Sequence, residues 1–251
     1  MAHQFGFGID VGGSGIKGAQ VDIDTGDFVG DRLIVDTPSP ATPDTVASTI
    51  ASMVESAGWD GPVGITLPSV IRNQVALSAA NIDPTWIGTN TMDLFTEYLP
   101  GREVSVLNDA DAAGLAEVAF GDPNARRGSV LFLTFGTGIG SAFLLNGVLF
   151  PNTEIGHLHV GDREAEHIAS SAVKTREGLS YEEWAERVEV VLREYEHLFN
   201  PTAFVVGGGI SADHARWLHL INIRTPLFPA RLRNRAGIVG AAMAANNHLN
   251  P

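Results

Sequence analysis

The segment Val104–Asp111, VSVLNDAD, carries the side chains whose types and spacing best suit chemistry. Its alternating apolar residues end at Asn108–Asp109, and a helix-favouring stretch follows directly, so we expect Asp109 where a strand passes into a helix. The partial positive charge at a helix N-terminus favours an ionised carboxylate that can accept a proton. Asp109 is therefore a candidate general base, although Asp is also a preferred helix cap and the residue alone does not decide between the two roles.

Three glycine-rich turns lie on either side of this segment, at Gly12–Gly15, Gly136–Gly138 and Gly207–Gly209. The first two share the pattern G-[ST]-G-I-x-[GS]-A, and each follows an apolar strand and leads into another strand. Backbone amides with a Ser14 or Thr137 hydroxyl can cradle phosphate oxygens. The third turn is predicted to precede a helix, where the backbone can approach an anionic or flat ligand.

Two other interpretations of these turns stay open. The first turn, which follows Asp10 at the end of its strand, could be a plain hairpin connection, since glycine also serves positive φ angles. The second turn resembles a fragment of the Rossmann dinucleotide fingerprint. That interpretation is disfavoured because the alternating residues Ser141–Leu145 predict a strand where a Rossmann unit begins a helix.

A polar loop, Pro151–His159, brings Glu154 and His157 three residues apart, with Glu166 further along. These side chains could bind hydroxyl groups, hold a metal ion or lie on the surface, because a bare E-x-x-H spacing is a weak signal. The sequence contains no cysteine, which excludes disulfides and zinc centres built on thiolates.

The repeated strand–turn–strand unit predicts two similar α/β lobes that offer their turns to a shared cleft. We expect a smaller N-terminal lobe at residues 1–108, beginning β-β-β-α-β, and a larger lobe at residues 109–251. Helices are predicted over 43–57, 91–99, 111–120 and 180–199, the last opened by a Ser180–Glu183 capping box. The small residues of a closing helix, 236–247, are expected to pack back onto the N-terminal lobe.

Composition narrows the class of protein. A net charge of −13 argues against binding to DNA or RNA. The chain has no apolar run of about 18 residues and no basic segment leading into an apolar core at its start, so we expect a cytoplasmic protein without membrane contact. All 29 acidic residues lie at or before Asp213. The arginines beyond it are therefore either a solvated face or, with Lys17, Lys174 and Arg176, a track for a polyanion; the closest group among them is Arg231, Arg233 and Arg235.

The motifs DVGGSGIKG, LNDADAAGLAE, FGTGIGSA, EIGH and VVGGGIS, in this order, resemble the ROK family of repressors and sugar kinases over about residues 5–245. The resemblance implies the two-lobed actin-like (ribonuclease H-like) ATPase fold with a duplicated β-hairpin phosphate-binding unit. Most ROK kinases carry a cysteine-rich zinc motif after EIGH. This chain has AEHIASSAVKTREGLSYEEW instead, which is similar to the family's polyphosphate-using glucokinases and implies no zinc site.

The resemblance also implies roles for individual residues. Asp109 would take the proton from a sugar 6-hydroxyl, while Asn108, Glu154, His157 and Glu166 would hold the other hydroxyls. Asp10 would hold magnesium through water. The remaining donor-binding positions are Gly12, Gly13, Ser14, Lys17, Gly136, Thr137 and Gly138, with Gly207, Gly208 and Gly209 near the nucleotide or its equivalent.

The implied activity is that of a hexokinase-type phosphotransferase, in a homodimer, that makes glucose 6-phosphate from inorganic polyphosphate, ATP or both. Mannose 6-phosphate is a second candidate product. One alternative is an ATP-only ROK kinase for fructose or an N-acetylated sugar. Another is a non-catalytic ROK-type sugar sensor. The sensor is disfavoured because the first strand is expected by residue 5, which leaves no room before it for a DNA-reading helix-turn-helix.

Overall fold

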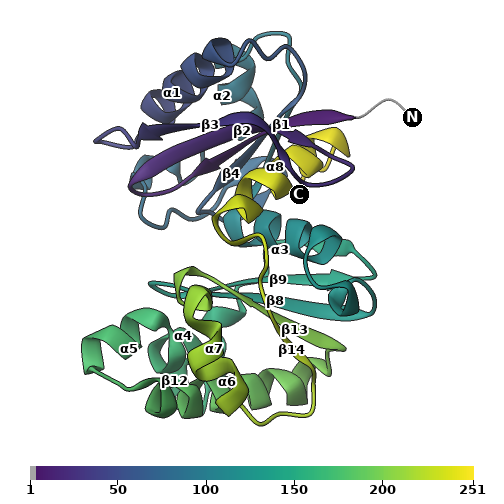
Figure 1. Ribbon diagram of the computed structural model, residues 1–251. Helices are drawn as coiled ribbons and strands as arrows, with labels where there is room; N and C mark the ends of the chain where they lie inside the picture. The colour runs from purple at the N-terminus through teal and green to yellow at the C-terminus, as the bar shows by residue number, and fades with distance from the viewer. Residues whose placement is uncertain (1–3) are drawn as a thin grey trace. The chain divides into compact units, whose positions relative to one another are not determined.

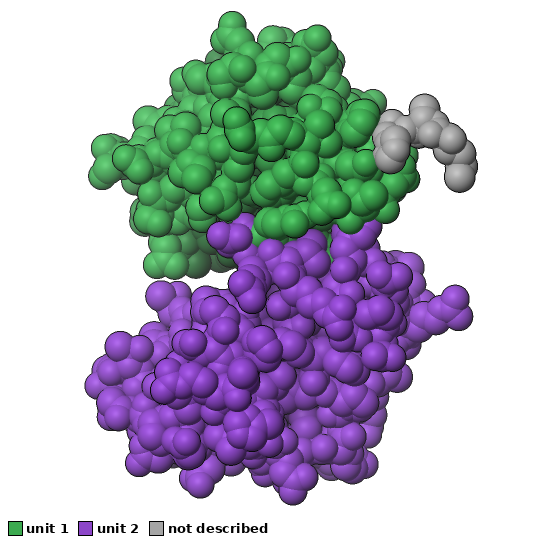
Figure 2. Space-filling view, viewed as in Figure 1, with its two compact units in different colours: residues 1–116, 235–251 green, residues 117–234 purple. Residues whose placement is uncertain are grey.

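The computed structural model describes residues 4–251, which form two compact units (Figure 1). The first unit runs to Ala116 and resumes from Arg235 to Pro251, and the second comprises Glu117–Asn234 (Figure 2). Within the part of the chain that is described, no helix is both long enough and apolar enough to cross a membrane.

The first unit is built on a five-stranded sheet of order β3-β2-β1-β4-β7. An antiparallel meander, β1 (Phe5–Val11), β2 (Gly15–Asp22) and β3 (Phe28–Asp36), comes first. The strands β4 (Val63–Leu67) and β7 (Val104–Asn108) then continue the sheet in parallel with β1. Asp10 pairs with Thr66, and Leu67 pairs with Asn108. Asp10 and Asn108 therefore lie at the same end of the sheet, where the parallel strands finish.

The second unit repeats this arrangement in the order β10-β9-β8-β13-β14. The meander consists of β8 (Ser129–Phe135), β9 (Ile139–Leu145) and β10 (Val148–Phe150), and the parallel strands are β13 (Ala203–Gly207) and β14 (Leu227–Pro229). The predicted duplication of the hairpin unit is confirmed. A strand follows Gly138, as expected, so the Rossmann interpretation is excluded.

Helices and short elements connect the strands. The helices are α1 (Pro43–Ser56), α2 (Thr91–Tyr98), α3 (Asp109–Phe120), α4 (Ala165–Ala169), α5 (Ser171–Glu177), α6 (Tyr181–Phe199), α7 (His214–Trp217) and α8 (Ala236–Asn246). Two-residue strands form two small hairpins, β5 (Ile71–Arg72) with β6 (Val75–Ala76) and β11 (His159–Val160) with β12 (Arg163–Glu164). The Ser180–Glu183 capping box of α6 is present. The third glycine turn enters a 3-10 turn, Gly209–Asp213, before α7 begins.

The two faces of the first sheet are covered differently, because side chains alternate along a strand. Phe7 and Ile9 of β1 are buried in an apolar cluster that also contains Ile50 of α1. The intervening Gly8 and its neighbour Gly64 face α8. A Cβ at Gly8 would lie 1.9 Å from the Ile238 carbonyl oxygen, and one at Gly64 would lie 1.8 Å from the Ala241 carbonyl oxygen. Helix α8 therefore packs directly on the sheet backbone.

We expect Gly64→Ala to lower the free energy of unfolding by about 3 kcal/mol, since a methyl group would push α8 off β4. Urea unfolding of the variant against the parent measures this change. Gly15→Ala is a matched control, because a Cβ there would meet its nearest atom at 3.6 Å, an ordinary contact. Equal unfolding midpoints for both variants would contradict the predicted packing of α8.

The expected boundary after Asn108 differs from the boundary between the compact units, which falls after Ala116. The reason is the packing of α3 on α8. A Cβ at Gly240 of α8 would lie 1.8 Å from the carbonyl oxygen of Ala112, and Leu107, Ala112 and Ala244 share one small apolar cluster. Most of α3, up to Ala116, is thus part of the first unit, and α8 belongs to the same unit.

Candidate active site

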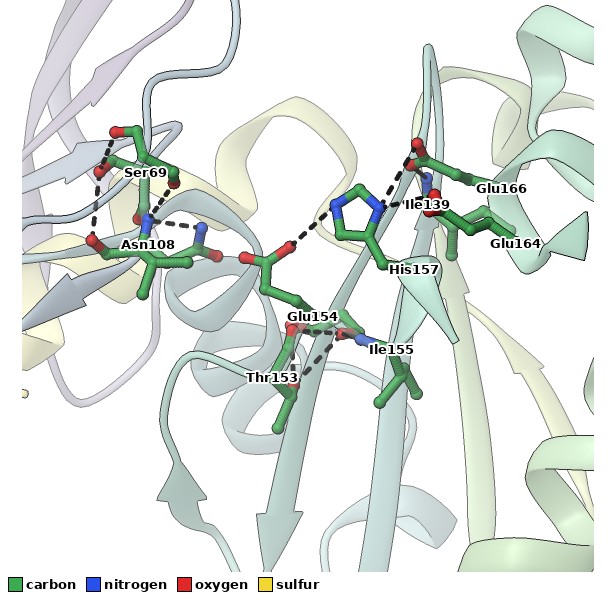
Figure 3. A network of polar contacts seen from close by, with 12 residues as sticks. Ser69, Asn108, Ile139, Thr153, Glu154, Ile155, His157, Glu164 and Glu166 are labelled. Carbon is green, nitrogen blue, oxygen red and sulfur yellow. Dashed lines mark hydrogen bonds and ion pairs between the residues drawn. The ribbon is translucent and has the colours of Figure 1, made fainter. Parts of the chain in front are cut away.

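Asp109 is the first residue of α3, and its side chain is exposed. The residue before it, Asn108, is buried and caps the helix: its Oδ1 accepts hydrogen bonds from the Ala110 and Asp111 amides at 2.8 and 3.2 Å. Its Nδ2 donates to the Ser69 carbonyl at 3.2 Å (Figure 3). The Asp109 carboxylate shares the Ala110 amide at 2.9 Å. Most of the capping therefore falls to Asn108, and Asp109 presents a carboxylate at a helix N-terminus.

Asp10, at the end of β1, is the second carboxylate at a helix start. Its Oδ1 accepts a hydrogen bond from the Thr66 hydroxyl at 2.9 Å. A Cβ at Gly237, in the first turn of α8, would lie 3.0 Å from the same oxygen. The absence of a side chain at Gly237 allows this close approach of Asp10 to the start of the helix. A carboxylate with a neighbouring hydroxyl is a ligand set that suits a hard divalent cation.

The first glycine turn is held by its own backbone and by two neighbouring loops. The Gly12 amide donates to the Gly15 carbonyl at 3.0 Å, and the Thr37 hydroxyl donates to the Gly12 carbonyl at 2.5 Å. A Cβ at Gly13 would lie 3.0 Å from the Asn81 carbonyl oxygen. Gly13 and Ser14 are exposed at the tip of this braced turn.

The second glycine turn is held by the start of α5 and by Glu166. The Gly136 carbonyl accepts hydrogen bonds from the start of α5, from the Ser171 hydroxyl at 2.9 Å and the Ala172 amide at 3.1 Å. Glu166 Oε2 accepts the Ile139 amide at 3.3 Å, and a Cβ at Gly138 would lie only 2.3 Å from that oxygen. Glu166 therefore supports the turn. The sequence predicted only a sugar-binding role for this residue.

The third glycine turn lies beside the second. Gly207 pairs with Thr134 where β13 and β8 end. Gly208 has φ of +84°, and a Cβ there would lie 2.4 Å from the Phe135 carbonyl oxygen, immediately before Gly136. Only glycine combines this conformation with so close an approach. The predicted donor-binding residues of the second and third turns thus lie together at one end of the second sheet, where β8 and β13 finish.

The EIGH segment forms a 3-10 turn, Ile155–His157, that three contacts hold in place. The Ser141 hydroxyl of β9 donates to the Thr153 carbonyl at 2.5 Å and accepts the Ile155 amide at 3.2 Å. The Tyr195 hydroxyl of α6 donates to the Ile155 carbonyl at 2.5 Å. Gly156 lies against β9, since a Cβ there would be 2.1 Å from the Ile139 carbonyl oxygen. Glu154 and His157 therefore stand on a firmly positioned backbone.

His157 is surrounded by carboxylates. Its Nδ1 lies 3.0 Å from Glu164 Oε2 and 3.7 Å from Glu166 Oε1, and its Nε2 lies 3.9 Å from Glu154 Oε2 (Figure 3). The hydrogen bond with Glu164, assisted by the negative charges of Glu166 and Glu154, raises the pKa of the His157 imidazole. Burial raises the pKa of the Glu154 carboxyl, and His157 opposes this shift.

Three of these residues could also hold a metal ion. His157, Glu164 and Glu166 offer ligand atoms that all lie within 4.8 Å of one another. The contact between His157 and Glu164 is nevertheless the length of a direct hydrogen bond. Glu164 was not among the residues singled out from the sequence, and neither was Ser141 as a brace; the repeated G-I-x-[GS]-A pattern marked the position of Ser141 without indicating its partners.

The candidate cationic track is largely engaged in other contacts. Arg231 pairs with Asp122, and Arg235 pairs with Asp27 at 2.9 Å. Lys174 Nζ donates to the Leu179 carbonyl at 2.8 Å, and Arg176 pairs with Glu177 at 3.2 Å. A role for these cations in holding a polyanion remains a prediction.

A model of the ROK family matches residues 6–170. The chain belongs to the ROK family. It is 54% identical over 243 residues to the polyphosphate glucokinase of Mycobacterium tuberculosis, a match that covers 97% of this chain and 92% of the relative. The glucokinase of Streptomyces coelicolor is 28% identical over 94% of this chain and 95% of its own length.

Solved ROK structures share the fold. The inorganic polyphosphate/ATP-glucomannokinase from Arthrobacter sp. strain KM superposes with a TM-score of 0.88 at 45% identity, covering 97% of this chain and 99% of that chain. A ROK family glucokinase from Streptomyces griseus, solved in complex with glucose and AMPPNP, gives a TM-score of 0.81 at 25% identity, covering 97% of this chain and 100% of that one. The expected family and actin-like fold are confirmed.

Proposed function

We propose that this ROK protein is a glucokinase that transfers a phosphoryl group from inorganic polyphosphate or ATP to the 6-hydroxyl of glucose. The observation that carries the proposal is the 54% identity with a polyphosphate glucokinase over nearly the full length of both chains. The exposed Asp109 carboxylate at the start of α3 agrees with this chemistry, since the acceptor hydroxyl must lose a proton to a positioned base.

The proposed mechanism assigns Asp109 to the acceptor. As the oxygen of the 6-hydroxyl attacks the terminal phosphorus, the Asp109 carboxylate takes its proton, and the bond to the leaving phosphate breaks. Transfer through a loose transition state depends on alignment and charge neutralisation, so a carboxylate of ordinary basicity suffices. The Asn108 amide has two N–H groups, and one of them donates to the Ser69 carbonyl. We assign the other N–H to a sugar hydroxyl. We assign the other hydroxyls to Glu154, His157 and Glu166.

The proposed donor site uses the glycine turns. Gly12, Gly13 and Ser14 of the first turn, with Lys17, and Gly136, Thr137 and Gly138 of the second turn would hold phosphate oxygens, and Gly207, Gly208 and Gly209 would lie beside the rest of the donor. Asp10 would hold Mg²⁺ through water, and the ion would supply neutralisation of the phosphate charge. Gly13, Ser14 and Thr137 are exposed at the tips of tightly braced turns, which suits this task because such turns need little reorganisation.

The proposal extends to properties that follow from family membership. We propose a homodimer in the cytoplasm that accepts glucose and also mannose, because the Arthrobacter structure is of a glucomannokinase. The net charge of −13 supports the absence of nucleic-acid binding. The main alternative is a ROK kinase that uses only ATP.

A coupled assay that crosses glucose, mannose, fructose and N-acetylglucosamine with ATP and polyphosphate tests the proposal. We expect turnover of glucose with polyphosphate, and slower or equal turnover with ATP. Activity with ATP alone would favour the alternative kinase. Absence of phosphorylated sugar with either donor would overturn the proposed activity.

A further inference from the structure

We infer that Glu164 is a positioning residue that orients the His157 ring for the sugar; this inference rests on the proposed role of His157 in holding a sugar hydroxyl. Of the three carboxylates around the ring, Glu164 makes the shortest contact, with Oε2 at 3.0 Å from Nδ1. The other two stand at 3.7 Å and 3.9 Å, beyond hydrogen-bond distance.

The contact fixes which ring nitrogen does what. Glu164 is partly exposed, and the His157 hydrogen bond lowers the pKa of its carboxyl, so the carboxylate acts only as an acceptor. Nδ1 must then carry a hydrogen and donate it to Glu164. This arrangement leaves Nε2, on the other side of the ring, facing Glu154 at 3.9 Å, a separation that a ligand hydroxyl could bridge.

The backbone places Glu164 for this task. It ends β12, where it pairs with His159 across the small hairpin that directly follows His157. The Ala165 amide donates to the Leu158 carbonyl at 2.9 Å, which closes the hairpin onto the EIGH turn. A short, hydrogen-bonded hairpin thus connects His157 to Glu164. Because the hairpin already restricts the backbone, the hydrogen bond between the two side chains costs less conformational entropy.

Glu166 is less suited to orient the ring, although it also contacts His157. Its Oε2 accepts the Ile139 amide beneath the second glycine turn, and its Oε1 lies 3.8 Å from His167 Nε2 as well as 3.7 Å from His157. Its position is therefore set by the turn. Glu164 also has a second histidine near it, His167, whose Nδ1 lies at the longer distance of 3.9 Å.

Glu164→Ala tests the inference in the full-length protein. Because a hydrogen bond to a charged carboxylate is lost, we expect the KM for glucose and the dissociation constant of glucose to rise about tenfold. The KM for polyphosphate and kcat should change less than about threefold, as expected when binding common to ground and transition state is removed. Glu164→Gln keeps an acceptor oxygen and should fall between the parent and the alanine variant. Asp162→Ala, an exposed acid on the same hairpin, is the matched control and should match the parent.

A double-mutant cycle separates positioning from a general structural effect. In a His157→Gln background, Glu164→Ala should raise the dissociation constant of glucose no further, because its target is gone. Nitrogen-15 spectra of the imidazole should show that His157 Nδ1 loses its fixed hydrogen in the alanine variant. A full tenfold effect in the His157→Gln background, or a parent-like dissociation constant for Glu164→Ala, would overturn the inference.

Two further outcomes keep this test distinct from that of the activity. If the parent protein phosphorylates no sugar, the proposed function fails, and direct glucose binding still reports on Glu164. If metal analysis finds one transition-metal ion per chain in the parent and none in Glu164→Ala, then Glu164 is a metal ligand and the positioning role is refuted.

Discussion

Replacement of Asp109 by asparagine is expected to lower kcat about 100-fold or more while glucose binding is largely kept. The substitution preserves the shape of a side chain that is exposed at the start of α3, and it removes the basicity that the acceptor hydroxyl requires. Steady-state kinetics with saturating donor, together with calorimetric titration of glucose, measure the two quantities separately.

The control for this variant is Asp93→Asn, an exposed acid in the first turn of α2 whose loss removes a similar charge from a similar helix position. It should retain the kcat of the parent. Near-parental turnover by Asp109→Asn would assign the base to another residue and leave Asp109 as a helix-terminal carboxylate only.

Replacement of Glu117 by alanine is expected to lower the free energy of unfolding by about 3 kcal/mol, because it leaves the buried Leu232 amide and the partly buried Arg231 amide without their acceptor. Glu117 is fully buried, and its carboxylate oxygens accept the Arg231 and Leu232 amides at 2.9 and 2.7 Å. Burial raises the pKa of this carboxyl, and the amides of the 231–233 loop oppose the rise. Glu117→Gln keeps one acceptor and should lie between the parent and the alanine variant.

Urea unfolding followed by circular dichroism measures this loss. Glu186→Ala, at an exposed position on α6, is the control and should unfold with the parent. A Glu117→Ala protein that unfolds within about 0.5 kcal/mol of the parent would show that water or a shifted loop satisfies the amides.

Much of the fold could be predicted from the sequence because its strands, turns and helix caps are determined by residues close together in the chain. The alternation in β1 and β8, the glycine turns after them and the Ser180–Glu183 capping box each depend on neighbours a few residues apart. The repeated hairpin also predicted the duplication, since two copies of one pattern imply two copies of one sheet. Strand ends in turn predicted where Asp10 and Asn108 emerge.

Contacts between distant residues were beyond this approach. Glu164 stands on a two-residue strand that leaves no periodic signal, so its hydrogen bond with His157 could not be anticipated. Arg231 was expected to lie on a solvated face or in a polyanion track, yet it pairs with Asp122, which is remote in sequence. The packing of α3 against α8 gave no signal in the sequence, because only the folded chain brings Ala112 and Gly240 together.

The placement of α8 has a consequence for the order of folding during synthesis. Strands β1 and β4 leave the ribosome early, yet the helix that covers their glycine face, over Gly8 and Gly64, is translated only after the whole of the second unit. The nascent first sheet must wait with that face uncovered, whereas the second unit has its own residues in one continuous stretch. We therefore expect the first unit, which is synthesised first, to complete its folding last. We also expect chaperones to shield its uncovered sheet face until α8 has been made.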